Sequence, residues 1–153
     1  MEHIRCYAAG MAAGTEALDR IVVASVAVTA RALASVAPEL TFLQWRALAL
    51  LAEVPPATIG AIADRIGASS SATSRLVGRL ESRKLVATAP DSEDRRATRV
   101  TLSGDGRTIV QKVLDARHAI LSRVAIHPRD GSVLDRLATD LTELDQPLPP
   151  ARP

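Results

Sequence analysis

Apolar residues recur at helical spacing along most of the chain and predict a mainly α-helical protein. The first helix is expected from about Thr15 to Val36, after a loose start that contains Gly10 and Gly14. Its apolar residues surround most of the helix, whereas a surface helix normally keeps one polar face. They are Leu18, Ile21, Val22, Val23, Val26, Val28, Leu33 and Val36. We expect a second copy of the chain to cover what one subunit leaves exposed; the alternative is a central helix of a monomer.

A second helix is predicted from Phe42 to about Glu53. Pro38 ends the preceding helix, and Thr41 and Gln44 have the spacing of a capping box, in which each side chain accepts a hydrogen bond from the other residue's amide. The residues expected to face inward are Trp45, Leu48 and Leu51. Trp45 is the only tryptophan, and core packing is the favoured interpretation over a place in the wall of a pocket.

Two short helices joined by a glycine turn are predicted next. Thr58 can cap the first helix, from Ile59 to Ile66, and Gly67 makes the turn. Ser69 can cap the second helix, which runs to about Arg83. The apolar stripes of the two helices contain Ile59, Ile62, Ala63 and Ile66, then Thr73, Leu76, Val77 and Leu80. This arrangement indicates a helix-turn-helix.

The opposite face of the second of these helices carries small hydroxyls and one guanidinium, where a soluble helix normally carries Glu and Lys. Its residues are Ser71, Ser74, Arg75 and Gly78. Because these side chains are small, the face can approach another backbone closely.

A β-hairpin with a charged tip is predicted over residues 85–102. Residues 85–89 and 98–102 have β-branched content, and residues 90–97 between them include two arginines and three acidic residues. A long helix should follow, from Ser103 and Gly104 to about Ile126, with Pro128 ending it. A last helix is expected from Ser132 to about Leu144, before an extended Pro-rich tail from Gln146 to Pro153.

The hairpin and its surroundings resemble the MarR (multiple antibiotic resistance regulator) family. Asp94-Arg95-Arg96, then Val100-Thr101-Leu102-Ser103 and Gly106, resemble the wing signature of that family, with Ser103 in place of the usual Thr. Together with the helix-turn-helix residues, the resemblance covers nearly all of residues 40–107. It implies a mainly α fold with a small β-hairpin wing, that is, a winged helix-turn-helix plus an α-helical dimerisation region.

The resemblance also implies how the chain is divided. Residues 1–153 are one MarR-like domain, in which residues 38–106 form the winged helix-turn-helix. Residues 1–37 and 107–146 form the helical dimerisation part, because the first and last helices of two subunits interlace in this family. Residues 147–153 are the Pro-rich tail.

The function implied is that of a sequence-specific regulator of transcription that binds double-stranded DNA as a homodimer on a pseudo-palindromic operator, as a ligand-responsive repressor. The second helix of the motif enters the major groove and the wing reaches the minor groove. The residues expected to bind DNA are Ser69, Ser70, Ser71, Ser74, Arg75, Arg79, Asp94, Arg95 and Arg96. Serines at the helix start suit phosphates, Ser74 and Arg75 suit base edges, and Asp94 is expected to orient the tip through an internal ion pair.

Two further expectations rest on the resemblance. A small phenolic or other anionic effector should bind between the dimer helices and the helix-turn-helix, with Phe42 and Trp45 as the nearest aromatic candidates. The alternative function is a winged-helix module that mainly binds another protein, without specific DNA binding.

Composition and charge fit these expectations. The chain has 153 residues, 47% hydrophobic and 24% charged, which is enough to bury the core of one domain. Net charge is only +2, but residues 57–107 contain nine basic and six acidic residues, so the positive excess lies in the winged helix-turn-helix. No apolar run is long enough to span a membrane and no secretory pattern begins the chain, so a cytoplasmic location is expected.

Other chemistry finds little support. The three histidines, His3, His118 and His127, have no partner at metal-ligand spacing, so neither a metal nor another cofactor is expected. No phosphate loop, nucleophile elbow or paired-acid motif argues for an enzyme. Cys6 is the only cysteine, and an incidental thiol is favoured over an oxidant sensor, because only Arg5 supplies a positive neighbour.

Overall fold

The computed structural model of the chain describes the backbone of residues 2–53, 56–91, 94, 96–124, 127 and 130–144, and the side chains of those residues from 14 to 142. In this part, six helices and three strands follow in the order α1, α2, β1, α3, α4, β2, β3, α5, α6. The predicted class, mainly α with a small β-hairpin, is confirmed.

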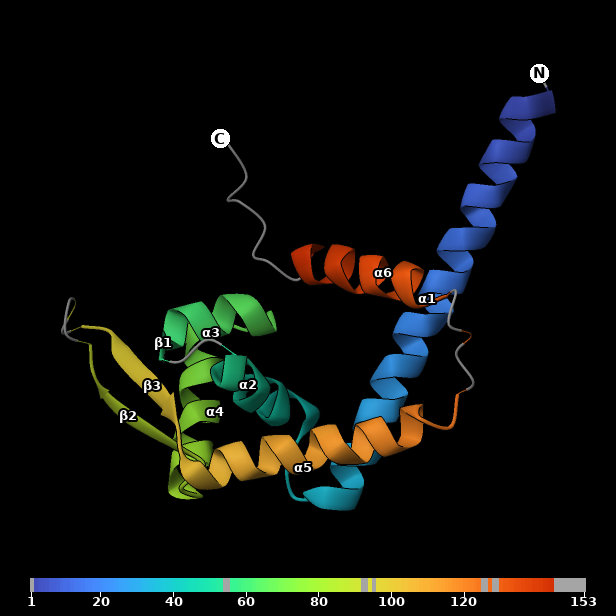
Figure 1. Cartoon of the computed structure of the whole chain (residues 1–153). Helices are drawn as coiled ribbons and strands as arrows, with labels where there is room; N and C mark the ends of the chain where they lie inside the picture. The colour runs from blue at the N-terminus through green and yellow to red at the C-terminus, as the bar shows by residue number, and fades with distance from the viewer. Residues whose placement is uncertain are drawn as a thin grey trace, which may run out of the picture.

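Helix α1 (Glu2–Val36) is longer than predicted. The expected loose start is wrong, since the helix already begins at Glu2 and contains both Gly10 and Gly14. A glycine inside a helix costs about 1 kcal/mol relative to alanine. The neighbouring alanines, which have the highest helix propensity, offset that cost. Figure 1 shows the N-terminal half of α1 extending far from the winged helix-turn-helix.

Helix α2 (Phe42–Glu53) has the predicted limits, and its capping box is formed. The amide of Thr41 donates to Gln44 Oε1 at 2.9 Å, and the amide of Gln44 donates to Thr41 Oγ1 at 3.2 Å. Leu48 and Leu51 are fully buried, and Trp45 is 7% exposed. The predicted inward face of this helix is therefore confirmed.

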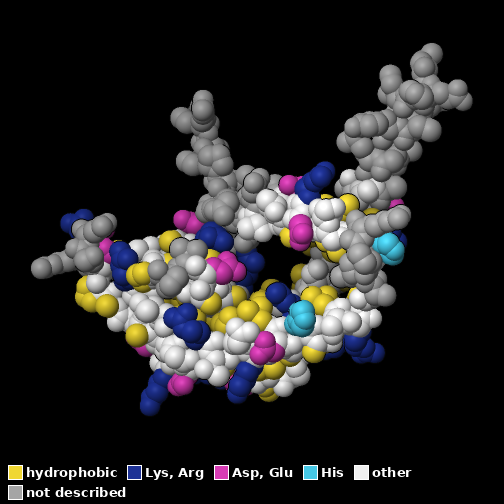
Figure 2. Space-filling view, in the orientation of Figure 1, with side chains coloured by type: hydrophobic (Ala, Val, Ile, Leu, Met, Phe, Trp, Pro, Cys, Tyr) yellow, Lys and Arg dark blue, Asp and Glu magenta, His cyan; other side chains and the backbone are white. Residues whose placement is uncertain are grey.

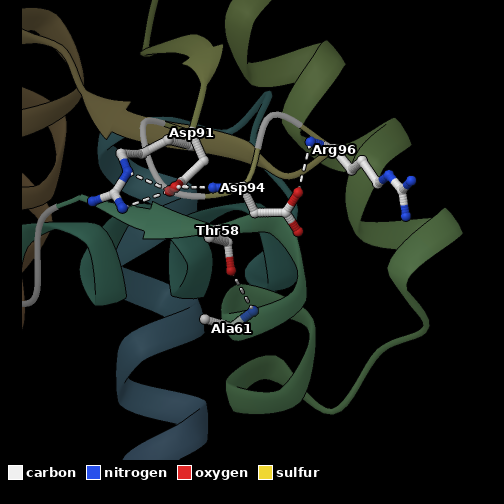
Figure 3. A network of polar contacts seen from close by, with 6 residues as sticks. Thr58, Ala61, Asp91, Asp94 and Arg96 are labelled. Atoms are coloured by element: carbon white, nitrogen blue, oxygen red, sulfur yellow. Dashed lines mark hydrogen bonds and ion pairs between the residues drawn. The ribbon is translucent and has the colours of Figure 1, made fainter.

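The helix-turn-helix is also formed as predicted, by α3 (Ile59–Ile66) and α4 (Ser70–Ser82). Thr58 Oγ1 accepts the amide of Ala61 at 3.2 Å and caps α3 (Figure 3). Gly67 ends α3 with φ 68°, the left-handed conformation that glycine adopts without strain. The stripe of α4 is buried, at Thr73, Leu76, Val77 and Leu80.

The sheet contains a strand that the sequence did not predict. Strand β1 (Ala57–Thr58) pairs antiparallel with β3 (Thr98–Leu102), which also pairs antiparallel with β2 (Val86–Pro90), so the strand order is β1-β3-β2. Strand β2 begins one residue later than predicted because the backbone of Leu85 is engaged elsewhere. Its amide donates to Leu80 O at 3.0 Å, and its carbonyl accepts the amide of Ser103 at 3.1 Å.

Helix α5 (Gly104–Leu121) is shorter than predicted, because it does not reach Ile126. After Leu121 the amides of Arg123 and Val124 bond to carbonyls three residues earlier, a tighter turn than an α-helix makes. Helix α6 (Gly131–Leu144) begins one residue before the predicted Ser132. Ile126, Pro128 and the tail lie outside the described residues.

Figure 1 shows how these elements are arranged. Helix α5 runs from the base of the wing, under α2, to α1, and α1 and α5 pack against each other. The hairpin of β2 and β3 projects at the opposite end of the molecule from α1. The core lies between α2, α3, α4, β3 and α5, with Leu48, Leu51, Ile62, Leu80, Val100 and Val113 among its most deeply buried side chains.

The end of α4, the base of the wing and the start of α5 meet at Gly106. A Cβ atom built on Gly106 would lie 2.2 Å from the backbone oxygen of Leu85 and 2.7 Å from Leu102 Cδ1. Ser103 reinforces the junction, because its hydroxyl donates to Lys84 O at 2.7 Å and accepts the amide of Gly106 at 3.0 Å. A residue with a side chain at position 106 therefore has to displace backbone.

We predict that Gly106→Ala lowers the free energy of unfolding by about 1 to 3 kcal/mol, the usual cost of overpacking. Gly104→Ala is the matched control, because a Cβ there meets nothing within 4 Å. Urea denaturation of both variants measures the difference. Equal stability of the two variants would contradict the close approach at Gly106.

Candidate nucleic-acid interface

The start of α4 is a capped helix end that leaves amides available. Ser69 Oγ accepts the amide of Ala72 at 3.3 Å, and the amide of Thr73 donates to Ser69 O at 2.9 Å. The amides of Ser70 and Ser71 precede that first intrahelical bond. Because the first turn of α4 contains no acidic residue, the positive end of the helix dipole is not offset there. Such an end suits a phosphate oxygen.

The face of α4 opposite the core is exposed along its whole length. Its residues are Ser70, Ser71, Ser74, Arg75, Gly78 and Arg79. The structure therefore brings all the helix residues predicted to bind DNA onto one accessible surface, which we call the α4 face. This surface combines hydroxyls at the helix start with guanidinium groups one and two turns further along.

Two contacts fix α4 relative to its neighbours. Glu81 Oε1 accepts both the amide of Thr88 at 3.0 Å and the hydroxyl of Thr88, and so joins α4 to strand β2. At the end of the helix, Arg83 Nη2 lies 2.9 Å from Glu39 Oε1, and Arg83 Nη1 donates to Glu39 O at 3.1 Å. The wing and the turn before α2 are thereby held against the same helix.

The wing presents Arg96 at its tip. The amide of Arg96 donates to Asp94 Oδ1 at 2.9 Å, and the exposed side chain of Arg96 extends away from that carboxylate (Figure 3). The amide of Ala97 donates to Asp94 O at 2.8 Å, which closes a tight turn around Arg96. The third predicted tip residue, Arg95, lies outside the described residues.

Among the described residues, the carboxylate of Asp94 accepts the backbone amide of Arg96, and its predicted ion pair stays a prediction because Arg95 lies outside those residues. Within the described part of the wing, an ion pair joins Asp91 to Arg99, with Asp91 Oδ2 2.5 Å from Arg99 Nη2. The sequence reasoning missed both residues. Asp91 and Arg99 have opposite charges and are eight residues apart across the predicted hairpin, which could have indicated an ion pair. Whether the two side chains meet depends on the register of β2 and β3, which the sequence does not give.

A hollow of about 270 Å³ lies between α1, α2, α3 and α5. Phe42 and Trp45 both line it, and their ring centroids are 6.0 Å apart. Trp45 therefore contributes both to the core and to the wall of this pocket. Trp45 Nε1 is buried and has no hydrogen-bond partner among the described residues. The charged residues of the lining are Arg46, Glu53, Arg65 and Arg117. Figure 2 shows hydrophobic and basic side chains around the hollow centre of the molecule.

The side chain of Cys6 lies outside the described residues. Within the described residues, no group of three or more His, Cys, Asp or Glu side chains could hold a metal ion. In the same part of the chain, no helix is long and apolar enough to cross a membrane.

Comparisons with known proteins agree with this geometry. The sequence profile of the MarR family matches residues 39–97. The HTH-type transcriptional regulator YsmB of Bacillus subtilis (strain 168) is 32% identical over 84 residues, which are 55% of this chain and 54% of YsmB. The chain thus spans about half the length of that relative.

Two solved structures are similar over nearly the whole chain. The crystal structure of RV1404 from Mycobacterium tuberculosis is 31% identical, covers 90% of this chain and 95% of that chain, and has a TM-score of 0.74. A MarR family protein from Bacillus stearothermophilus is 26% identical, with coverages of 87% and 94% and a TM-score of 0.73.

The helix-turn-helix, the wing and the flanking helices define a winged helix-turn-helix protein of the kind that regulates transcription. With the profile match and the similarity to RV1404, the chain belongs to the MarR family, whose members are transcriptional regulators. The recognition made from the wing residues is confirmed.

Proposed function

We propose that this protein is a sequence-specific DNA-binding repressor of transcription that acts as a homodimer on a pseudo-palindromic operator. The observation that carries the proposal is the α4 face, an exposed helix surface of hydroxyl and guanidinium groups beside a wing with an exposed arginine. The one acidic residue of α4, Glu81, lies near the end of the helix, where its carboxylate accepts hydrogen bonds from Thr88.

Each part of the surface has a physical task in this proposal. Ser69, Ser70 and Ser71 meet phosphate oxygens at the start of α4, where free amides and the helix dipole favour anions. Ser74, Arg75 and Arg79 enter the major groove, where Arg75 can make a bidentate contact to guanine. Arg96, together with Arg95 and oriented by Asp94, enters the adjacent minor groove, whose negative potential attracts guanidinium groups.

Exposed apolar side chains on the terminal helices support a homodimer. In α1, Val23 is 70% exposed and Val26 is 50% exposed, and in α6 Val133 is 55% exposed. Leaving these side chains in water is unfavourable, and a contiguous apolar patch on a soluble protein usually marks an interaction site. We propose that a second copy of the chain covers them, through residues 1–37 and 107–146. This arrangement would place two α4 helices about one turn of DNA apart.

The pocket supports an anionic effector. Trp45 Nε1 offers an unused donor and three arginines supply positive charge against the single carboxylate of Glu53. Phe42 and Trp45 give the site an apolar wall. Regulation of DNA binding by a small aromatic acid is named for a neighbour of the same fold, BpsR of Bordetella bronchiseptica, with 6-hydroxynicotinic acid (22% identity, TM-score 0.63). We propose a small phenolic or other aromatic anion for this chain.

The alternative function is a winged-helix module that binds another protein. It differs from the proposal in what the arginines do: a protein-binding module would keep its activity without Arg75 and Arg96, and would bind no duplex with strong salt dependence. A catalytic role has no support in the side chains around the pocket or the α4 face.

Replacing Arg75 and Arg96 tests DNA binding, with a duplex that the wild-type protein enriches from a random pool as the probe. Arg75→Ala should cost about 1 to 3 kcal/mol on that duplex and relax selectivity at one symmetric position. Arg96→Ala should weaken binding to every sequence and lower the salt slope by about one. Arg136→Ala on α6 removes the same charge outside the α4 face and the wing, and should change neither as long as light scattering shows the variant to have the mass of the wild-type protein. Fluorescence anisotropy at several salt concentrations measures these effects. Enrichment of no duplex, or an Arg96→Ala protein with unchanged affinity and salt slope, would contradict the proposal.

Light scattering tests the homodimer. We expect a dimer mass at micromolar concentration, and we expect Val23→Asp to shift the mass towards the monomer or to unfold the protein, because a charge would be buried at the interface. Ala61→Glu adds a negative charge at an exposed position of α3 and should leave the mass unchanged. A folded wild-type monomer at this concentration would rule the homodimer out.

Isothermal titration calorimetry with salicylate tests the effector class. Salicylate should bind, and Trp45→Phe, which keeps an aromatic ring but removes the Nε1 donor, should bind it about tenfold more weakly, the loss expected for one buried hydrogen bond. Binding of salicylate should also lower the affinity for the enriched duplex. The absence of both heat and any change in DNA affinity would exclude this class of ligand.

A further inference from the structure

A buried carboxylate lies at the base of the wing, where the proposed DNA contacts do not use it. Asp91 follows the last residue of β2 and is only 5% exposed. Its backbone amide donates to Ala97 O at 3.0 Å and continues the pairing between the two sides of the hairpin. Burying a carboxylate is costly unless charge and hydrogen bonds compensate it. The hydrogen bonds and the ion pair of the Asp91 carboxylate therefore indicate which parts of the wing this buried side chain holds together.

The two oxygens of Asp91 hold two different parts of the wing. Oδ2 accepts Arg99 Nε at 2.7 Å and lies 2.5 Å from Arg99 Nη2, so it is fixed to strand β3. Oδ1 accepts the amide of Asp94 at 3.1 Å, which belongs to the tip. The carboxylate thus joins a rigid strand to the tip (Figure 3).

From Asp94 the chain of contacts continues to Arg96. The carboxylate of Asp94 accepts the amide of Arg96 at 2.9 Å, and the carbonyl of Asp94 accepts the amide of Ala97 at 2.8 Å. The orientation of the Arg96 backbone, and hence the direction of its side chain, depends on where Asp94 is held. Asp91 and Arg99 determine that position without touching Arg96.

We propose that Asp91 and Arg99 are positioning residues that fix the wing tip so that Arg96 is preorganised for the minor groove. The inference rests on the proposed function, to which it adds two residues that do not themselves contact DNA. A pair of apolar side chains could join the strands with equal or greater stability, since a buried ion pair rarely stabilises more than a well-packed apolar pair. What a carboxylate adds is a second acceptor, aimed at the amide of Asp94.

Positioning and electrostatics predict opposite effects of Asp91→Asn on the affinity for DNA. Asp91→Asn removes a negative charge near the proposed DNA surface, and charge alone would strengthen binding to any duplex. Loss of the ion pair would instead release the tip and weaken binding. Positioning therefore predicts weaker binding by a protein that has become more positive.

The experiment uses the full-length chain and the duplex that the wild-type protein enriches from a random pool. We expect Asp91→Asn and Arg99→Gln each to bind about tenfold more weakly, and the double variant to be no weaker than the weaker single variant, because residues that act through one contact are not additive. Asp91→Asn should also lower the salt slope by about one as the Arg96 contact is lost. Asp64→Asn is the control, since it makes the same substitution at an exposed carboxylate of α3, outside the wing and the α4 face, and should not weaken binding.

Hydrogen–deuterium exchange without DNA provides a second, independent measurement. The amides of Asp94, Arg96 and Ala97 should exchange faster in Asp91→Asn, while the amides of α4 and α5 keep their protection. That pattern separates release of the tip from general unfolding. Arg99→Lys, which keeps the charge but loses the Nε contact, should give an intermediate rate and serves if Asp91→Asn does not fold.

Unchanged exchange at the tip overturns the inference, as does tighter DNA binding by Asp91→Asn. If the wild-type protein enriches no duplex, the proposed function fails, and the exchange measurement alone decides whether Asp91 and Arg99 fix the tip.

Discussion

The close approach of α5 to the end of α4 is the constraint on which the winged helix-turn-helix depends. Gly106 lets the backbone of α5 contact Leu85 O, and Ser103 joins the first turn of α5 to Lys84 O. Lys84 has φ 60°, a left-handed conformation that costs a non-glycine residue about 1 to 2 kcal/mol. The chain adopts it because the turn between α4 and β2 must bring Leu85 to both Leu80 and Ser103. The helix end, both wing strands and α5 are thus set by a few backbone contacts.

The elements that the sequence predicted well are those specified by neighbouring residues. The capping box of Thr41 and Gln44, the caps at Thr58 and Ser69, and the stripe of α4 each involve residues within a few positions of one another. The exposed α4 face followed from the same periodicity. Local hydrogen bonds and helical spacing suffice for such features, and the structure confirms them.

The features that were missed depend on residues far apart in the sequence. Strand β1 has only two residues, and it is a strand only because Ala57 and Thr58 meet Val100 and Arg99 of β3. Thr58 was correctly assigned as a cap, but its pairing could not be deduced from its neighbours. Asp91 looked like one of several acids in a charged tip, and its burial against Arg99 depends on the hairpin register. The limits of α1 and α5 differed because glycines within a helix and tight turns after one are decided by small differences in free energy.

Helix α5 is a continuous, rigid connection between the wing and the region that packs against α1. Its 18 residues connect the base of the wing with the region packed against α1, a length of about 27 Å at 1.5 Å per residue. A rod of this length works as a lever: a tilt of about 5° at one end moves the other by roughly 2 Å, on the scale of the helix shifts that accompany allosteric transitions. At the wing end, the close backbone contact at Gly106 holds α5 firmly against Leu85. Any change in the packing of α1 against α5 is therefore expected to reach the wing as a rigid displacement.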